Sequence, residues 1–261
     1  MTANHRVCAI VPSHDHWKVV GTVVARLRAA GLAVFVIDDG SGEPARTVLA
    51  GLHDEAGGVT VVRLDPNQGK GCAVVAGFRL ALAAGFTHAV QVDADGQHDL
   101  DALAGLLALS DRYPTALVSA QAVYDETVPL GRRIGRWVTH VWVWIETLSL
   151  DIADSMCGFR VYPLAAVGSL LARHGVGRRM DFDPEIMVRL FWAGTPVVML
   201  PVKVIYPPDN TSNFDLLADN WRITRMHTRL VVAMLLHSPS ILLNRPQRLD
   251  RAGASSANRE P

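Results

Sequence analysis

Two aspartates one residue apart, in the stretch V-Q-V-D-A-D-G-Q-H at 90–98, follow an apolar run typical of a buried strand. Asp93 and Asp95 would repel each other unless a metal ion or basic side chains lay between them. A magnesium ion suits such a pair, because it takes one or two carboxylates besides waters and substrate phosphates. Gln97 offers a further carbonyl oxygen, and His98 offers a nitrogen for Mn²⁺. A simple surface turn is the alternative, since Asp-Ala-Asp-Gly is good turn sequence.

Polar residues also follow three other apolar runs. At the end of the second run, 33–38, the carboxylates of Asp38 and Asp39 could accept hydrogen bonds from a ribose hydroxyl or a base. Alternatively, they could cap a turn. The stretch N-Q-G-K-G at 67–71 would let the backbone approach a phosphate while its lysine adds charge. It lacks the G-x-x-x-x-G-K-S/T spacing of a Walker A loop and the G-x-G-x-x-G of a dinucleotide fold. The candidate ligand-binding residues are Pro12, Ser13, His14, Asp15, Asp38, Asp39 and Lys70, together with Asp93.

Short apolar segments that alternate with helical patterns would hold these residues in place. The predicted strands are 7–12, 33–38, 59–64 and 88–93, and the predicted helices are 16–31, 44–56 and 70–85. This alternation predicts an α/β fold with a mostly parallel sheet and helices on both faces. Because ligands bind outside the carboxyl ends of such strands, the polar segments should meet at one edge of the sheet.

The alternation weakens after residue 115. Strands are predicted at 116–121, 158–162 and 197–206, helices at 131–150 and 184–194, and a turn at 207–210. We expect a catalytic domain over 1–215, an amphipathic helical segment over 216–244, and a disordered tail over 245–261.

Composition narrows the class of protein. The 261 residues include 25 basic and 25 acidic side chains, and this balance argues against binding nucleic acid through phosphate neutralisation. The three cysteines are far apart and are expected to be reduced thiols. The first residues lack the apolar stretch of a signal peptide, which predicts a cytoplasmic location.

Two apolar segments favour contact with a membrane surface. The segment 137–150 holds three tryptophans, and 230–243 follows the basic side chains of Arg222, Arg225 and Arg229. Basic residues beside an apolar segment are typical of an interfacial helix. No uninterrupted apolar run is long enough to span a bilayer. We therefore expect peripheral association with the inner face of the membrane, with a core helix or an oligomer contact as the alternative.

The four segments in which the predicted strands end resemble, in their order along the chain, the motifs of the family 2 glycosyltransferases. The segments are V-P-S-H-D at 11–15, I-D-D-G-S at 37–41, N-Q-G-K-G-C-A-V at 67–74 and V-D-A-D-G-Q-H at 92–98. The resemblance is nearest to the dolichol-phosphate, or polyprenyl-phosphate, mannosyltransferase branch and covers about 7–215. C-G-F-R at 157–160 and F-D-P-E at 182–185 match two further segments of that branch.

The resemblance implies a GT-A fold, a nucleotide-diphosphate sugar donor, and Mg²⁺ or Mn²⁺ as cofactor. It places the segment 12–15 and Asp38 or Asp39 beside the nucleoside. Asp93 would lie between nucleotide and metal, with Asp95 and Gln97 as direct ligands of the ion. Arg160 would support the diphosphate or the acceptor.

The acceptor side departs from that branch. Its members usually carry R-x-x-G-x-S-K after the last strand, whereas this chain has P-P-D-N-T-S-N-F, with Pro207 and Asn213 in place of Arg and Lys. A hydroxyl acceptor would need a general base, and Asp183 and Glu185 are the candidates. Alternatively, these two carboxylates complement the dipole of the predicted helix 184–194.

The sequence thus predicts an inverting, metal-dependent glycosyltransferase that moves a sugar from a nucleotide-diphosphate sugar to a lipid-linked or hydrophobic acceptor, such as a polyprenyl phosphate. Three alternatives stay open: transfer to a soluble or pigment-like small molecule, a nucleotidyltransferase, and a catalytically idle nucleotide-binding module. Nucleic acid is not an expected partner, and the oligomeric state is open.

Overall fold

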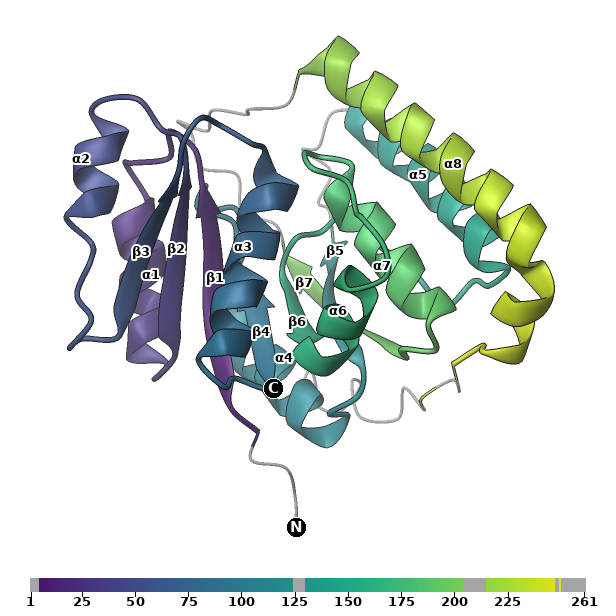
Figure 1. The fold of residues 1–261 in the computed structure, drawn as a ribbon, viewed down its shortest axis with the longest axis horizontal. Helices are drawn as coiled ribbons and strands as arrows, with labels where there is room; N and C mark the ends of the chain where they lie inside the picture. The colour runs from purple at the N-terminus through teal and green to yellow at the C-terminus, as the bar shows by residue number, and fades with distance from the viewer. Residues whose placement is uncertain (1–4, 124–129, 204–214, 247–248, 250–261) are drawn as a thin grey trace, which may run out of the picture.

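A seven-stranded sheet forms the centre of the chain (Figure 1). The computed structural model describes residues 5–123, 130–203, 215–246 and 249. The strands are β1 (Val7–Ser13), β2 (Ala33–Asp39), β3 (Val59–Leu64), β4 (His88–Gln91), β5 (Leu117–Val123), β6 (Arg160–Pro163) and β7 (Val197–Lys203). Their order is β3-β2-β1-β4-β6-β5-β7, and only β6 runs antiparallel to its neighbours. The predicted mostly parallel sheet is confirmed.

Helices flank this sheet, most of them where the sequence predicts them. They are α1 (Val20–Ala29), α2 (Ala45–Ala50), α3 (Lys70–Ala83), α4 (Leu103–Arg112), α5 (Leu130–Thr147), α6 (Leu164–Leu171), α7 (Phe182–Trp192) and α8 (Leu216–Leu243), with the short 3-10 helix η1 (Leu100–Ala102) before α4. Two of these, α4 and α6, were not predicted. The sequence of α6, L-A-A-V-G-S-L-L, is apolar nearly throughout, so it shows little periodicity.

Both faces of the sheet are buried, which explains the continuous apolarity of its strands. One core cluster joins strand side chains such as Ile10 to α3, α6 and α7, and the other joins neighbours such as Val11 to α1, α2 and α4. Neighbouring residues such as Ile10 and Val11 belong to different clusters because successive side chains of a strand point to opposite faces of the sheet. Cys8 and Cys157 lie in these clusters as free thiols, as expected from the sequence.

The long helices α5 and α8 pack together at one end of the molecule, remote from β3 and α2 (Figure 1). On α8 the side chains of Ile223, Met226 and Leu230 are buried against the rest of the protein. The helix therefore extends the core beyond α7 while its opposite side stays exposed.

The helix α8 is long and apolar enough over Leu217–Leu243 to cross a membrane, with a mean hydropathy of 1.3 in its most apolar part. This differs from the expectation that no segment has the length to span. Charged residues interrupt the apolar run in the sequence, but the second half of the helix holds few of them. Only 28% of that part is buried in the protein.

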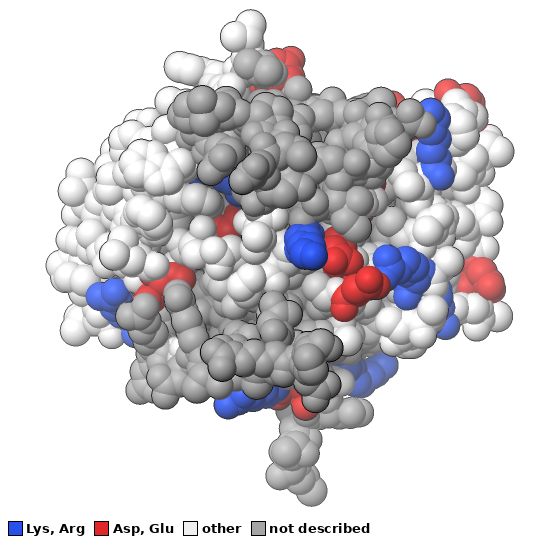
Figure 2. All heavy atoms as spheres, turned by 180° about the vertical axis from the view of Figure 1, so that it is seen from behind, with Lys and Arg blue, Asp and Glu red and all other residues white. Residues whose placement is uncertain are grey.

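Charged side chains of both signs are interspersed on the face shown in Figure 2, where no extended field of one sign is visible among the described residues. This agrees with the equal numbers of basic and acidic residues.

Candidate active site

The carboxyl ends of the parallel strands bring the sequence-predicted residues together at one edge of the sheet. In the register of β1 and β2, Pro12 pairs with Ile37 and Ser13 with Asp38. The strand β4 lies on the other side of β1 and leads directly to Asp93. The convergence follows from the parallel arrangement, as the sequence predicted.

A lysine bridges two carboxylates at the centre of this edge. The Nζ atom of Lys70, the first residue of α3, lies 2.8 Å from Oδ2 of Asp93 and 2.8 Å from Oδ2 of Asp183. Burial would lower the pKa of Lys70, but the two carboxylates raise it above its ordinary value. Likewise burial would raise the pKa of Asp93, but Lys70 and His98 hold it below the usual range. Lys70 and Asp93 are therefore both charged at neutral pH.

His98 adds a second positive charge beside Asp93. Its Nε2 lies 3.4 Å from Oδ2 of Asp93, and its ring stacks on Phe159 with 5.2 Å between centroids. Burial lowers the pKa of His98, but hydrogen bonds to Asp93 and Cys157 raise it to about 10. A protonated imidazole has no lone pair to offer a metal. Without a bound ion, His98 therefore stabilises Asp93, and it would have to lose its proton to become a Mn²⁺ ligand.

The carboxylates of Asp93 and Asp95 still have oxygen atoms that could bind a metal ion. Oδ1 of Asp93 is buried and has no hydrogen-bond partner among the described residues. Oδ1 of Asp95 accepts a hydrogen bond from the backbone N–H of Gln97 at 3.0 Å. Within the described part of the chain, no group of three or more His, Cys, Asp or Glu is placed to hold a metal. Two carboxylates still fit an ion that draws its other ligands from water and substrate phosphate.

Asp39 fixes the loop that leads to Lys70. Its Oδ1 accepts from the backbone N–H of Gln68 at 2.7 Å, and its Oδ2 accepts from the N–H of Gly69 at 2.7 Å and from Nδ2 of Asn67 at 3.0 Å. Both oxygens are thus engaged within the protein, as in the turn-capping alternative. Oδ1 keeps one acceptor position, but Asp39 is only 3% exposed, so a nucleoside would have to reach a buried oxygen to bond there.

Asp38 is engaged in a similar way. Its Oδ1 accepts from the N–H of Ser41 at 2.9 Å, and its Oδ2 forms an ion pair with Arg63. Only 2% of Asp38 is exposed. The structure thus gives both aspartates of β2 a loop-fixing position, as in the turn-capping alternative, and their place beside a nucleoside stays a prediction.

The loop after β1 is tied to the loop after β2. The N–H of Asp15 donates to Oγ of Ser41 at 3.0 Å, and Oδ1 of Asp15 accepts from the N–H of Gly42 at 2.9 Å. Nε2 of His14 lies 3.7 Å from Oδ2 of Asp15. The hydroxyl of Ser13 is buried and has no hydrogen-bond partner in the described part of the chain, so it can serve a ligand.

Arg160 lies deep below the site. It is completely buried, and its guanidinium donates to the backbone carbonyls of Asp183 at 2.6 Å and Ser155 at 2.5 Å. No part of the side chain reaches the surface, so the predicted contact with a diphosphate or an acceptor is not made in this conformation and stays a prediction. Arg160 instead fixes the backbone that carries Asp183.

The two candidate bases on α7 point to different neighbours. Asp183 faces Lys70, whereas Oε1 of Glu185 lies 2.8 Å from Nε of Arg189 and its Oε2 lies 2.9 Å from Arg229 of α8. Residues two apart on a helix are rotated by about 200°. Lys70, Asp93 and Asp183 thus form one cluster, the Lys70 centre, and Glu185 lies outside it.

Two residues of the centre were not predicted from sequence. A Cβ at Gly158 would come within 2.9 Å of Lys70, Asp93 and Gln91, so the backbone packs directly on the centre there. Gln91 is completely buried and donates from Nε2 to Oδ1 of Asp183 at 3.1 Å. A glutamine within the apolar run of β4 was the available signal, because a buried polar side chain needs a partner.

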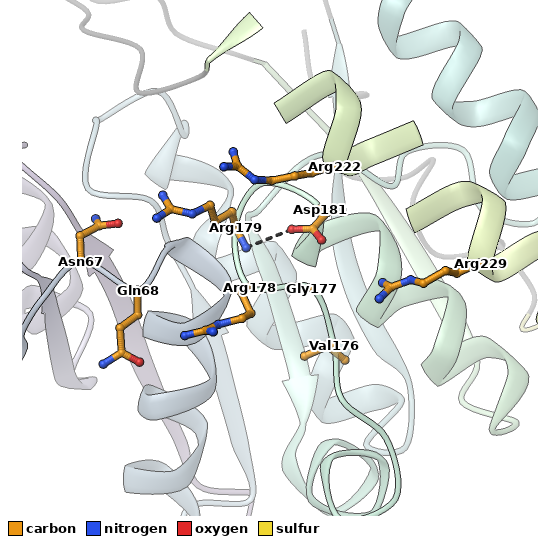
Figure 3. Close-up of a pocket in the computed structure, with 9 residues that line it drawn as sticks. All are labelled: Asn67, Gln68, Val176, Gly177, Arg178, Arg179, Asp181, Arg222 and Arg229. Carbon is orange, nitrogen blue, oxygen red and sulfur yellow. Dashed lines mark hydrogen bonds between the residues drawn. The ribbon is translucent and has the colours of Figure 1, made fainter. Parts of the chain in front are cut away.

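A pocket of about 570 Å³ lies next to this centre (Figure 3). It is lined by Asn67, Gln68, Val176, Gly177, Arg178, Arg179, Asp181, Arg222 and Arg229. Arginines enter it from two sides, from the loop before α7 and from α8. The adjacent arginines before F-D-P-E were a sequence signal that the motif analysis did not use.

Comparisons with known proteins agree with this arrangement. The family model described as glycosyl transferase family 2 matches residues 8–168. An undecaprenyl-phosphate mannosyltransferase from Micrococcus luteus is 26% identical over 208 residues, covering 77% of this chain and 84% of that protein. A polyprenol monophosphomannose synthase from Mycolicibacterium smegmatis is 26% identical over 203 residues, covering 76% of each chain.

A solved structure shows the same fold. Glucosyl-3-phosphoglycerate synthase from Mycobacterium tuberculosis superposes with a TM-score of 0.59 at 14% sequence identity, covering 94% of this chain and 82% of that one. The family match spans more than half of the chain and contains β1 to β4 with the strand-end motifs that follow them. The chain is therefore an enzyme of glycosyltransferase family 2, with a GT-A fold.

Proposed function

We propose that this family 2 glycosyltransferase moves one sugar from a nucleotide-diphosphate sugar to a lipid-linked acceptor, with inversion at the anomeric carbon. The observation that carries the proposal is the Lys70 centre, in which one ammonium group joins Asp93 and Asp183 at the carboxyl ends of the parallel strands. The similarity to two polyprenyl-phosphate enzymes supports the choice of acceptor class.

The donor nucleotide would lie over the ends of β1, β2 and β4. The segment 12–15 and the loops held by Asp38 and Asp39 would line the nucleoside through their backbone and through the free hydroxyl of Ser13. Lys70 would lie near the diphosphate, where a fixed positive charge stabilises the negative charge that develops on the leaving group.

A divalent ion, Mg²⁺ or Mn²⁺, fits Asp93 and Asp95, with Gln97 as a third protein ligand. The buried Oδ1 of Asp93, which lacks a partner among the residues described, supports this assignment. When bound, such an ion acts as a Lewis acid toward the departing diphosphate. The role of Lys70 and His98 is to keep Asp93 ionised.

In the transfer step, an acceptor oxygen attacks the anomeric carbon from the side opposite the diphosphate. The new carbon–oxygen bond forms as the bond to the phosphate oxygen breaks, and the electron pair leaves with the nucleoside diphosphate. A hydroxyl acceptor would give its proton to Asp183, the candidate base that lies in the centre. An ionised phosphate acceptor needs no base, and Asp183 would then orient Lys70.

The helices α5 and α8 would hold the enzyme on the inner face of the membrane, with 1–215 as the catalytic domain and 216–244 as the interfacial segment. The exposed apolar side chains on these helices include Trp137, Trp142, Leu217, Trp221, Leu235, Leu236 and Leu243. One side of α8 packs on α5 and α7, so the helix suits a position along the surface better than a crossing.

Turnover by the full chain tests this function. Transfer is measured with a panel of nucleotide sugars, Mg²⁺ or Mn²⁺, and either a polyprenyl phosphate in vesicles or soluble acceptors. Asp95→Asn should lower kcat/KM by at least about 100-fold and weaken Mn²⁺ binding observed by electron paramagnetic resonance. Asp101→Asn, at an exposed aspartate paired with Arg26, is the matched control.

The remaining results separate the alternatives. Release of pyrophosphate from a nucleoside triphosphate would identify a nucleotidyltransferase. Efficient transfer to soluble acceptors without vesicles would replace the lipid acceptor. Nucleotide binding without any turnover would identify an idle module, and full activity of Asp95→Asn would refute the role given to the acidic pair.

A further inference from the structure

The pocket beside the Lys70 centre carries an excess of positive charge. Four arginines line it, Arg178, Arg179, Arg222 and Arg229. A fifth, Arg189, shares the carboxylate of Glu185 with Arg229. Three carboxylates face them: Asp181, Glu185 and Asp219. Two positive charges therefore remain unbalanced, although the chain as a whole is neutral. A phosphate monoester carries about −1.5 to −2 charges at neutral pH, which matches this excess.

Among these arginines, Arg178 and Arg179 have no ion-pair partner within the described residues. Arg222 pairs with Asp219 at 2.7 Å and Arg229 pairs with Glu185 at 2.9 Å, so both already have carboxylate partners. The guanidinium of Arg179 makes no hydrogen bond or ion pair with any residue that the structure describes, and Arg178 bonds only to the thiol of Cys72 at 3.3 Å. Both side chains are exposed to the pocket and have donors to offer a ligand.

The backbone beneath these two arginines is tightly fixed. Gly69 has a φ of +101°, and a Cβ there would come within 2.5 Å of the carbonyl oxygen of Arg178. The N–H of Cys72 donates to that same oxygen at 3.2 Å. The loop before α7 is thus anchored on the first turn of α3, which holds the arginine pair in place before any ligand binds.

The pocket lies between the reaction centre and the helix assigned to the membrane surface. Asn67 and Gln68, which line it, belong to the loop that ends at Lys70. On the opposite side Arg222 and Arg229 project from α8, as Figure 3 shows. Trp221, next to Arg222 on α8, is 70% exposed. A ligand with a phosphate in the pocket could thus extend an apolar chain along α8.

We propose that the pocket binds the phosphate group of a phosphorylated lipid acceptor, with Arg178 and Arg179 as its principal contacts. This inference rests on the proposed transfer to a lipid acceptor and specifies how that acceptor is recognised. The donor diphosphate is the other source of phosphate, but the proposed function assigns it to Asp93. Lys70 separates Asp93 from Asp183 of α7, the helix that packs on α8. Arginine suits the task because its planar group makes paired bonds to phosphate oxygens.

These arginines would supply the positive charge that the usual R-x-x-G-x-S-K segment gives in related enzymes. Residues 207–213, where this chain has P-P-D-N-T-S-N, lie outside the described residues, so the comparison rests on the sequence alone. The charge that recognises the acceptor would here come from the loop before α7 and from α8 instead.

Direct binding tests the inference without turnover. Calorimetry on the full chain compares farnesyl phosphate, farnesol, inorganic phosphate and nucleoside diphosphates. The double variant Arg178→Gln/Arg179→Gln should bind farnesyl phosphate about 10- to 100-fold more weakly and bind nucleoside diphosphates unchanged, because charge-assisted bonds to one ligand are lost. The matched control is Arg173→Gln/Arg225→Gln, which removes two exposed arginines that do not line the pocket.

Each result has a separate meaning. If the double variant loses affinity for the nucleoside diphosphate instead, the pocket holds the donor and the inference is wrong. Equal affinity of the wild type for farnesyl phosphate and farnesol would also overturn it. If the wild type transfers sugar to a polyprenyl phosphate and the double variant does so with the same KM for that acceptor, this inference is wrong and the proposed function stands. If farnesyl phosphate binds as expected and no nucleotide sugar is used, the proposed function fails instead.

Discussion

Replacing Lys70 by methionine should expose how strongly the centre depends on one charge. The ammonium group lies 2.8 Å from a carboxylate oxygen on each side, so its loss leaves the two carboxylates to repel each other, with His98 as the remaining positive neighbour of Asp93. Breaking a buried ion pair in this way costs about 3–5 kcal/mol. Side-chain exposures of 17% for Lys70, 22% for Asp93 and 6% for Asp183 place the cost near the lower end, at about 3 kcal/mol.

The expected decrease in Tm follows from this cost. For a chain of this size, 1 kcal/mol shifts the Tm by about 2–4 °C. Lys70→Met should therefore unfold about 6–12 °C below the wild type at pH 7 in scanning calorimetry. Lys203→Met, which removes an exposed lysine at the end of β7, is the matched control and should change the Tm little.

The pH dependence supplies a second measurement. In the wild type the pKa of Asp93 is lowered on folding, so its contribution to stability is present above the ordinary aspartate pKa of about 3.9 and is lost below it. The pKa of Lys70 is raised, so its contribution is complete below about pH 10.4 and is lost above that. In Lys70→Met, acid protonates Asp93, which the lost lysine no longer holds ionised, and so removes the repulsion. The difference in Tm from the wild type should therefore shrink between pH 7 and pH 4.

Two outcomes would contradict this reasoning. One is a Tm for Lys70→Met within 2 °C of that of Lys203→Met, because the charge would then not stabilise the centre. The other is a Tm deficit that stays constant down to pH 4, because the cost would then come from lost packing rather than from repulsion. Lys70→Met/Asp93→Asn should recover part of the lost stability.

Three further predictions follow from the site and the outer helices. Gly158→Ala should lower kcat by about 10-fold or more, because its Cβ would press on the centre, whereas Gly175→Ala, which has open space around it, should not; steady-state kinetics decides. NMR should find His98 charged well above pH 7, and the stability that it gains from Asp93 should be complete below about pH 6.5 and lost as the pH rises to about 10. Leu236→Asp, at a side chain that is 73% exposed, should reduce co-sedimentation with anionic vesicles, and unchanged binding would exclude this face of α8 from the membrane contact.

The positions of the strand ends were predictable because they depend on local patterns. Short apolar runs with helical segments between them predicted the first four strands, and a parallel sheet places the carboxyl ends of such strands along one edge. Asp93 and Lys70 were therefore assigned to the same site before any contact was known. The ion pair between Lys70 and Asp93 needed the three-dimensional structure.

The partners that come from the second half of the chain were harder to predict. Asp183 reaches Lys70 only because α7 packs against α3, and no local pattern specifies such a contact. The same is true of Gly158, which approaches Asp93 through the backbone. The burial of Arg160 was likewise not visible in the sequence, because the backbone carbonyls that stabilise it inside the protein belong to residues brought together by the fold.

The first turn of α7 connects the two sites that the proposals describe. Asp183 faces the Lys70 centre on one side of the helix, and Glu185 holds Arg229 of the pocket on the other. Both carboxylates are nearly completely buried, so neither can lose its partner without a cost in free energy. A shift of α8 that moved Arg229 would act on Glu185 and hence on the turn that carries Asp183. An acceptor bound against α8 and a donor bound at the strand ends would therefore share one rigid element between them.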